Sequence, residues 1–349
     1  MCACRVESET GAEISTSHWP MRVPYDQVHD TLRSILLERG MTRARANLCA
    51  RLFADASRDG VPSHGLNRFP LFVSCIDRGL VDVNAEPTRV AAFGVLERWD
   101  GHYGPGNLAA RACMERAIAL SREHGVGVVA LANTNHWMRA GNVGWQAAEA
   151  GVVGICWTNT LPNLPPWGST SPSIGNNPLV IGVPREGGHV VLDMAMSQFS
   201  YGALSVARMR GEELPVDGGY DADGNFTRDP SAIEATRRLL PAGYWKGSGL
   251  SIVLDMIAAL LSGGRATHEI NPDPRDETGQ SQVFVAIDPV MLGAADDVVD
   301  RIVESVHASG EGVRYPGERT LATRAASLRD GVEVEPAIWE SVQGLVEGK

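Results

Sequence analysis

The sequence has no long hydrophobic run and no excess of basic charge. No apolar stretch approaches the roughly 18 residues that a membrane-spanning helix needs. The 31 basic side chains are outnumbered by 42 acidic ones, which gives a formal net charge of -11 at pH 7. Because an acidic surface repels phosphate backbones and anionic lipids, the composition predicts a soluble protein with neither a nucleic-acid nor a membrane partner.

Cysteine pairs and the common catalytic signatures are also absent. The six cysteines are scattered and contain no C-x-x-C pair, so we expect reduced thiols in a cytoplasmic protein. There is no phosphate loop, no H-E-x-x-H and no G-x-S-x-G elbow. Residues 217–225 resemble a calcium loop, but Pro230 stands where the bidentate glutamate belongs, so we interpret them as a solvated turn. We therefore expect no metal site.

The remaining composition is that of a globular protein. Hydrophobic residues make up 44% and charged residues 21%, and 349 residues can fill one large domain or two ordinary ones. Residues 1–20 carry neither a secretion signal nor amphipathic periodicity and are predicted to be a disordered extension. Its removal is expected to leave activity and melting temperature unchanged, since a disordered tail buries no apolar surface.

Hydrophobic periodicity divides the rest of the chain into a helical part and an α/β part. Apolar residues recur at three- and four-residue spacing in residues 21–90, and helical patterns return at residues 296–349. Within residues 91–295, helices alternate with short apolar runs that are typical of strands. These runs are residues 126–132, 152–158, 177–184, 189–195 and 281–288. We predict a mixed-sheet α/β body with a helical domain formed by the N- and C-terminal segments.

One segment matches the dinucleotide-binding fingerprint G-x-G-x-x-A but lies in the wrong context. The segment is Gly125–Ala130, and a predicted helix precedes it while a predicted strand follows. The fingerprint needs the opposite order, because the pyrophosphate binds at the start of the helix. The glycines are better explained as a helix C-cap, so a Rossmann fold is not expected.

Three polar clusters lie among glycine, proline and aromatic residues, and the first is Ser63–Arg68. Here His64 and Arg68 are one helical turn apart. The arginine could hold a carboxylate while the imidazole exchanges a proton beside it. The alternative is a surface histidine next to a solvated arginine.

The other two clusters follow predicted strands. Asn133–Arg139 comes directly after the strand at 126–132, where α/β proteins place ligand contacts, although a capped turn would explain it equally. Trp157–Thr160 is followed by a rigid loop at Pro162–Gly168 and by Gly175–Pro178. These loops either offer backbone donors to a ligand or only connect strands.

The clusters carry a resemblance to a known family. The strings S-H-G-x-x-R, N-x-N-H-W-M-R, G-I-C-W-T-N, P-P-W-G, I-G-x-N-P-L and V-L-D-M-A-M-S resemble the type II malate/L-lactate dehydrogenase family, over about residues 21–345. The resemblance implies a nicotinamide cofactor bound without a Rossmann fold, and a homodimer with its sites near the subunit interface. It implies reversible hydride transfer at C2 of a 2-oxo/2-hydroxy carboxylate, with NADH as the expected cofactor and NADPH as the alternative.

The resemblance also assigns roles to individual residues by motif. His64 matches the proton donor, His136 matches a second active-site histidine, and Arg68 matches a clamp for the substrate carboxylate. Which histidine is the main acid/base stays open. The implied cofactor contacts are His189, Val190, Val191, Leu192, Asp193, Met194, Ala195, Trp245, Lys246, Gly317, Glu318, Arg319, Thr158 and Thr160.

The implied chemistry suits these side chains. Hydride addition to a ketone leaves negative charge on oxygen, which a positioned acid such as His64 neutralises. Lys246 stands before a Gly-Ser-Gly helix start and suits phosphate or ribose oxygens, and Asp193 suits ribose hydroxyls or a histidine. Without the resemblance, a salt-bridged lysine and a helix-capping aspartate would be the simpler explanations.

Within the family, the strings TNHWMR and GYWKGSG favour a 2-oxo sugar acid as substrate, because their aromatic and polar groups suit a polyhydroxylated molecule. The alternatives are a dehydrogenase of malate, lactate or ureidoglycolate, or a reductase of a cyclic imine acid. From a different class, a non-catalytic sugar-acid binding protein is disfavoured by the two intact histidines.

Overall fold

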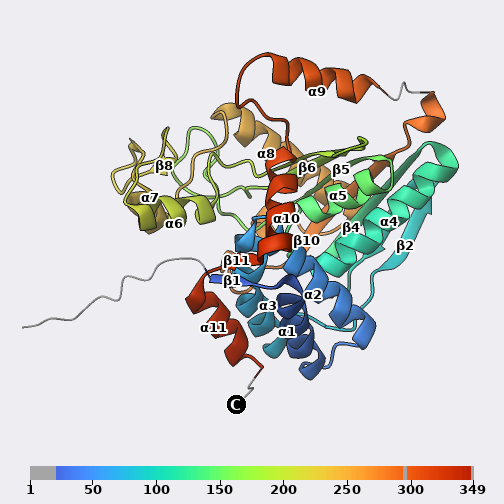
Figure 1. The fold of residues 1–349 in the computed structure, drawn as a ribbon, viewed down its shortest axis with the longest axis horizontal. Coiled ribbons are helices and arrows are strands. Elements are labelled where there is room, and N and C mark those ends of the chain that lie inside the picture. The colour runs from blue at the N-terminus through green and yellow to red at the C-terminus, as the bar shows by residue number, and fades with distance from the viewer. Residues whose placement is uncertain (1–20, 294–296, 347–349) are drawn as a thin grey trace, which may run out of the picture.

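The computed structural model describes residues 21–293 and 297–346, and the predicted extension at residues 1–20 lies outside them. A central sheet carries helices on its faces, and a helical region built from both ends of the described chain packs beside it (Figure 1). This confirms the predicted fold class, a mixed-sheet α/β body with a helical region from N- and C-terminal segments.

The central sheet has seven strands in the order β2-β3-β4-β10-β5-β6-β7. The strands are β2 (Thr88–Phe93), β3 (Leu96–Asp100), β4 (Val126–Asn135), β5 (Val153–Thr158), β6 (Leu179–Val183), β7 (Val190–Met194) and β10 (Thr278–Ile287). Only β3 and β4 pair in parallel, and all other neighbours are antiparallel, so the sheet is mixed. The two longest strands, β4 and β10, lie inside the sheet, while β7 forms one edge.

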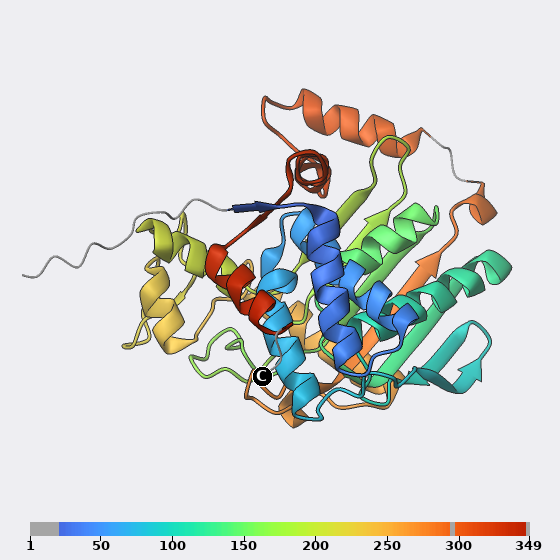
Figure 2. The ribbon, with the colours of Figure 1, turned by 60° about the horizontal axis from the view of Figure 1, so that its bottom comes forward.

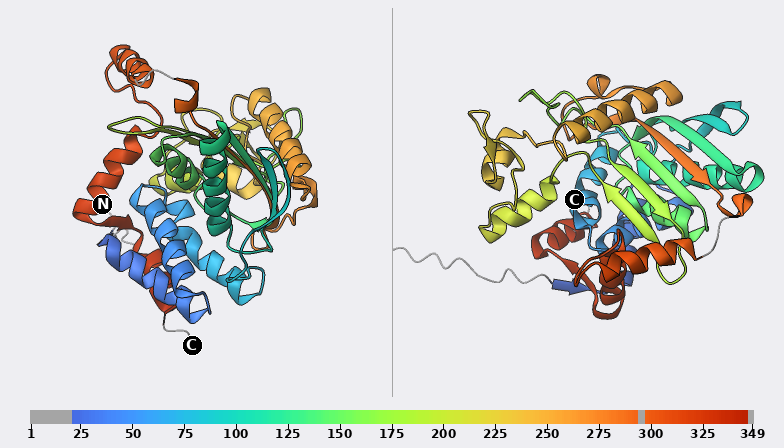
Figure 3. Two further views of the ribbon diagram at one scale, coloured as in Figure 1. Left: turned by 90° about the vertical axis from the view of Figure 1, so that its right-hand side faces the viewer. Right: turned by 90° about the horizontal axis from the view of Figure 1, so that it is seen from above.

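Helices cover both faces of the sheet (Figure 3). On one face, α4 (Gly106–His124) and α5 (Gly141–Glu149) bury a core that includes Met114 and Phe284. On the other face, α8 (Trp245–Ser262) packs against β10, β4 and β5. Because both faces are covered, β4, β5, β6 and the second half of β10 carry nearly continuous apolar runs, which make these strands recognisable in the sequence.

Helix α8 corrects the expectation that no apolar segment approaches a spanning length. By length and composition alone, its 18 residues could cross a membrane. One side of the helix packs on the sheet, so core packing explains part of its apolar character. Its other side exposes Leu250, Val253, Met256 and Leu260. We call these four residues the α8 face.

The helical region combines the two ends of the described chain (Figure 2). It contains α1 (Tyr25–Glu38), α2 (Arg43–Arg58), α3 (Phe69–Asp77), α10 (Glu318–Asp330) and α11 (Pro336–Gly344). Strand β1 (Met21–Val23) pairs antiparallel with β11 (Val332–Val334), which joins the ends directly. The spacing of Val28, Leu32 and Leu36 places the apolar side of α1 in this core, as predicted.

Two further segments stand apart from these layers. Between β7 and α8 the chain forms α6 (Tyr201–Arg210), the short hairpin of β8 (Gly219–Tyr220) and β9 (Phe226–Thr227), and α7 (Pro230–Thr236). Helix α9 (Val298–Ala308) lies away from the first three helices in Figure 1. It is tied to the turn between β6 and β7 by a 2.6 Å hydrogen bond from Nε of Arg185 to Asp300.

The structure confirms that Gly125 is a helix C-cap. Gly125 ends α4 with φ at 85°, and its N–H donates to the carbonyl of Ser121. Strand β4 follows at once, so the fingerprint segment runs from helix to strand and offers no helix start to a pyrophosphate.

Candidate functional site

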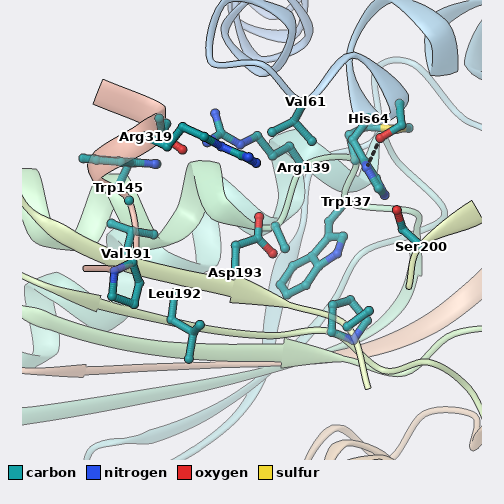
Figure 4. Close-up of a pocket in the computed structure, with 18 of the residues that line it drawn as sticks. Val61, His64, Trp137, Arg139, Trp145, Val191, Leu192, Asp193, Ser200 and Arg319 are labelled. Atoms are coloured by element: carbon teal, nitrogen blue, oxygen red, sulfur yellow. Dashed lines mark hydrogen bonds between the residues drawn. The ribbon is translucent and has the colours of Figure 1, made fainter. Parts of the chain in front are cut away.

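A cavity of about 610 Å³ opens between the helical region and the β7 edge of the sheet (Figure 4). Its walls come from the 3-10 turn η1 (Pro62–His64), the connection from β4 to α5, β7, and the start of α10. The sequence-predicted residues on these walls are His64, His136, Thr160, Val191, Leu192, Asp193, Ala195, Gly317 and Arg319. Segments that are far apart in the sequence therefore meet at one site.

His64 reaches the cavity because a tight turn follows helix α2. The buried N–H of Leu66 donates to the hydroxyl of Ser57 at 2.8 Å, which ties the turn to the end of that helix. The hydroxyl of Ser63 lies 3.1 Å from Nδ1 of His64. Among the residues that the structure describes, Nε2 of His64 has no hydrogen-bond partner, so this nitrogen is available to a ligand.

His136 follows the end of β4 in a strained turn. Met138 has φ at 62°, a left-handed conformation that is uncommon for a residue with a side chain. The turn brings the N–H of Met138 to within 3.0 Å of Nδ1 of His136. An Nδ1 that accepts a hydrogen bond leaves the proton of the neutral ring on Nε2. The turn therefore presents His136 as an Nε2 donor.

The two imidazole rings face each other across the site. Their centroids are 5.8 Å apart and their planes differ by 16°. Burial, and then the charges of Arg68 and Arg139, lower the pKa of His64 to about 4. Burial, followed by the charges of Arg68 and His64, also lowers the pKa of His136 well below its usual value. Both rings are therefore neutral at pH 7 in the ligand-free site, and an anionic ligand would raise their proton affinity.

Arg68 lies behind the histidines rather than on the wall of the main cavity. Its Nη2 donates to Oε2 of Glu277 at 3.1 Å, and Gln280 donates to the other carboxylate oxygen at 2.6 Å. Burial raises the pKa of Glu277, and the charge of Arg68 opposes this shift. Arg68, Glu277 and His136 together line a small cavity of about 20 Å³. A substrate carboxylate at Arg68 would therefore compete with Glu277.

Asp193 faces the cavity from β7 (Figure 4). Its Oδ2 accepts a 2.8 Å hydrogen bond from the N–H of Gly141, at the start of α5. Burial raises the pKa of this carboxyl, while the charge of Arg139 opposes the shift. A carboxylate with one backbone donor keeps lone pairs free, so it can accept from ligand hydroxyl groups.

The start of α10 closes the cavity at the free edge of the sheet. The N–H of Val191 donates to the carbonyl of Pro316 at 2.9 Å. Gly317 has φ at 97°, and a Cβ there would lie 3.1 Å from the nitrogen of Val191, so glycine allows this close approach. Arg314 and Arg319 line the cavity, and within residues 21–293 and 297–346 neither forms an ion pair. A helix N-terminus with two such arginines suits a phosphate.

Other predicted cofactor contacts do not line this cavity. Trp245 and Lys246 begin α8 and are exposed. Thr158 is buried, and its hydroxyl donates to the carbonyl of Asn159 at 2.9 Å. Val190, Met194 and Glu318 are sequence neighbours of wall residues but do not line the cavity themselves. The same holds for His189, whose ring centroid lies 6.1 Å from that of the wall residue Trp145. The cofactor roles of all these residues stay predictions.

A buried ion cluster behind the cavity had no clear signal in the sequence. Asp59, whose side chain is 1% exposed, accepts hydrogen bonds from Arg58 (2.8 Å), Arg139 (2.5 Å) and Arg324 (2.9 and 2.7 Å). Burial alone would raise the pKa of Asp59, but these guanidinium groups lower it to about 2. Arg139 lines the cavity, and the guanidinium of Arg324 lies 4.5 Å above the ring of Trp145, another wall residue.

Sequence comparisons agree with the resemblance in the motifs. The family model described as malate/L-lactate dehydrogenase matches residues 23–343. The chain is 46% identical over 333 residues to 2,3-diketo-L-gulonate reductase of Citrobacter koseri, covering 93% of this chain and all of the relative. A protein of the same name from Escherichia coli O139:H28 is 45% identical over the same shares.

Solved structures share the fold over nearly the whole chain. Delta1-piperideine-2-carboxylate reductase from Pseudomonas syringae matches with a TM-score of 0.84 and 32% identity, covering 93% of this chain and 99% of that one. Sulfolactate dehydrogenase from Methanocaldococcus jannaschii matches with a TM-score of 0.86 and 27% identity, covering 94% and 97%. These two enzymes are oxidoreductases of different acids, so the fold alone does not select a substrate.

Proposed function

The chain belongs to the malate/L-lactate dehydrogenase family and is an oxidoreductase, and from this premise we propose that it reduces the C2 carbonyl of 2,3-diketo-L-gulonate to 3-dehydro-L-gulonate. The family's members depend on a nicotinamide cofactor, and for this chain we propose NADH. Sequence identity supports this choice of substrate. The chain is 46% identical, over 93% of its length, to a 2,3-diketo-L-gulonate reductase, but only 32% identical to the cyclic imine acid reductase.

One observation supports the proposal most directly. His64 and His136, from separate regions of the chain, stack in a cavity that also contains Arg314 and Arg319 without ion pairs among the described residues. The net charge of the whole chain is -11, so this cavity is a local site of positive charge on an acidic protein. Such a field attracts an anionic cofactor and an anionic substrate.

The residues present fit a nicotinamide dinucleotide. The volume of about 610 Å³ lies within the range of about 300–1,000 Å³ that is typical of small-molecule sites. Arg314, Arg319 and the N-terminus of α10 would hold the phosphates, and Asp193 would accept from a ribose hydroxyl. When bound, the cofactor supplies the hydride that adds to C2 of the substrate.

The chain's own residues supply the proton and the orientation. As negative charge develops on the carbonyl oxygen, the proton on a protonated His64 passes to that oxygen and completes the hydroxyl group. His64 starts from a pKa of about 4, so binding of the anionic substrate must raise its proton affinity before the proton can be delivered. Arg68 would bind the substrate carboxylate and so orient the carbonyl group toward His64. To do so, Arg68 would either break its hydrogen bond to Glu277 or donate to both carboxylates.

We also propose a homodimer that forms through the α8 face. Its four residues recur at three- and four-residue spacing and expose between 40% and 80% of their surface, which makes one continuous apolar stripe. Trp245 and Lys246 lie at the start of the same helix, outside this chain's own cavity. A dimer across the stripe would place these two residues at a subunit interface. This accords with their predicted role as cofactor contacts, because the resemblance predicts that the active sites lie near that interface. Met256→Glu is expected to convert the dimer to monomers in analytical ultracentrifugation.

The reaction is tested by following the absorbance of the reduced nicotinamide. NADH and NADPH are each mixed with 2,3-diketo-L-gulonate, oxaloacetate, pyruvate and a cyclic imine acid. We expect the highest kcat/KM with NADH and 2,3-diketo-L-gulonate. A higher kcat/KM with another acid would reassign the substrate, and no oxidation of either cofactor would favour a binding protein.

We also propose that the enzyme works in the cytoplasm. Four cysteines of the described residues are free thiols, which accords with a reducing compartment; they are Cys49, Cys75, Cys113 and Cys156.

A further inference from the structure

The Asp59 cluster joins three separate parts of the chain at a single carboxylate. Arg58 belongs to the end of α2, Arg139 to the connection from β4 to α5, and Arg324 to α10. The side chains of Asp59 and Arg139 are 1% and 3% exposed. Because buried ionic hydrogen bonds depend strictly on geometry, the carboxylate fixes the relative positions of these three segments.

Two of the three arginines connect the carboxylate to the cavity. Arg139 lines the cavity itself, and within the described part of the chain its Nε has no hydrogen-bond partner. Arg324 donates to both oxygens of Asp59 and lies 4.5 Å above the ring of Trp145. Trp145 is 4% exposed and forms part of the wall. The position of this wall therefore depends on Asp59 through Arg324.

The same helix that carries Arg324 begins at the cavity. Gly317, Arg319 and Thr320 line the cavity at the start of α10, about one helical turn before Arg324. The bidentate bond from Arg324 to Asp59 therefore fixes the position of the first turns of α10. Through the same guanidinium it also fixes the position of the Trp145 ring. Figure 4 shows Arg319, Trp145 and Arg139 around the same part of the cavity.

We propose that Asp59 is a positioning residue for cofactor binding, which it supports by fixing α10 and the Trp145 wall through Arg324. The inference rests on the proposed function, because it takes this cavity as the dinucleotide site. Asp59 touches neither cofactor nor substrate in this scheme. It preorganises the binding surface, so that the cofactor does not have to order α10 when it binds.

Two arginines on the same carboxylate make the test specific. Arg324→Met removes the bidentate bond and the cation above Trp145 while preserving much of the apolar stem. Arg58→Met is the matched control, because Arg58 also donates to Asp59 but neither lines the cavity nor contacts Trp145. Each variant is examined as the full chain for NADH affinity by fluorescence titration, for kcat at saturating NADH, and for melting temperature.

We expect Arg324→Met to raise the Kd for NADH about tenfold, with kcat at saturation changed less than about threefold. Arg58→Met is expected to lower the melting temperature comparably and to change the Kd less than about twofold. Asp59→Asn is expected to raise the Kd at least as much as Arg324→Met does, and Asp59→Glu to restore part of the affinity.

The opposite results would overturn the inference. If both arginine variants raised the Kd equally, in step with their loss of stability, the cluster would be purely structural. If neither changed the Kd, the position of α10 would not depend on Asp59. Wild-type protein that bound neither NADH nor NADPH would instead refute the proposed function, so the two failures are distinguishable.

Discussion

The imidazole rings of His64 and His136 lie nearly parallel with their centroids 5.8 Å apart. One ring comes from the turn after α2 and the other from the turn after β4. At this separation two positive charges would repel each other in a buried site, so the pair can hold one proton far more readily than two. The two histidines therefore titrate as a coupled pair, and mutating each in turn should show which one is the main proton donor.

His64→Ala is expected to lower kcat by about 10²–10⁴-fold and to leave the Kd for NADH nearly unchanged. Proton donation is needed only in the transition state, so its loss affects turnover more than cofactor binding. Stopped-flow kinetics and NADH titration measure the two effects separately. His136→Ala is the comparison, and wild-type kcat in the His64 variant together with inactivity of the His136 variant would transfer the acid role to His136.

Stability is expected to fall as the pH drops from about 6.5 to about 4, partly because of His64. Its pKa is about 4 in the folded protein and about 6.5 in an unfolded chain, so the unfolded state binds more protons in this window. His64 does not affect the free energy of unfolding above pH 6.5, and below pH 4 it lowers this free energy by on the order of 3 kcal/mol. His136 acts in the same direction, whereas the raised pKa values of Asp193 and Glu277 act in the opposite one.

Comparison with a variant isolates the histidine from these carboxyl groups. Urea unfolding of wild type and His64→Gln is measured at pH 7 and at pH 5. The wild type should lose more stability than the variant between the two values. Equal losses would show that His64 keeps an ordinary pKa in the folded protein.

Arg68→Lys is expected to raise the KM for the 2-oxo acid more than it lowers kcat. Lysine keeps the positive charge near Glu277 but loses the two-pronged geometry that suits a carboxylate. Initial rates at saturating NADH give both constants. Arg68→Met would leave Glu277 buried without its cation and is expected to destabilise the fold by about 3 kcal/mol, so the lysine variant is the more informative one. An unchanged KM in Arg68→Lys would place Arg68 outside the substrate site.

Gly144→Ala is expected to destabilise the protein by about 1–3 kcal/mol. A Cβ at Gly144, within α5, would lie 2.5 Å from Cγ1 of Val180 and 3.0 Å from Cγ1 of Val191, so helix and sheet would have to separate. Gly344→Ala in α11 is the control, because a Cβ there meets no atom within 4 Å. Denaturant midpoints with unchanged slopes measure both effects, and equal midpoints would contradict close packing of α5 on the sheet.

Much of the fold could be predicted because buried elements have a strong pattern. The inner strands β4, β5 and β10 each contain an apolar run, and the amphipathic α1 and α2 have helical spacing. The strands β2 and β3 were missed, since every residue of β2 is exposed and the strand includes Arg89. An exposed edge strand needs no buried face, and the inner strand β3 buries the charged Glu97 rather than an apolar run, so hydrophobic alternation identifies neither strand.

The candidate site was predictable in its parts but not in its connections. The sequence clusters contain His64, His136 and Arg68, but no local pattern shows that Arg68 pairs with Glu277, 209 positions away. The Asp59 cluster has the same character, because its three arginines belong to distant segments. Apart from Arg58, which is the sequence neighbour of Asp59, these partners are brought together by tertiary packing alone, and each residue taken singly resembles an ordinary surface charge.

The pairing of β1 with β11 has a consequence for how the molecule is made. Met21 pairs with Val334, so β1 has no strand partner until β11 has been synthesised. The part of the chain that covers the cavity, around Gly317 and Arg319, also leaves the ribosome after every strand of the central sheet. The central sheet can therefore form before α10 and β11 have been synthesised, whereas the helical region and the finished cavity can form only afterwards. A nascent chain arrested before residue 316 would then contain a folded sheet and no complete active site.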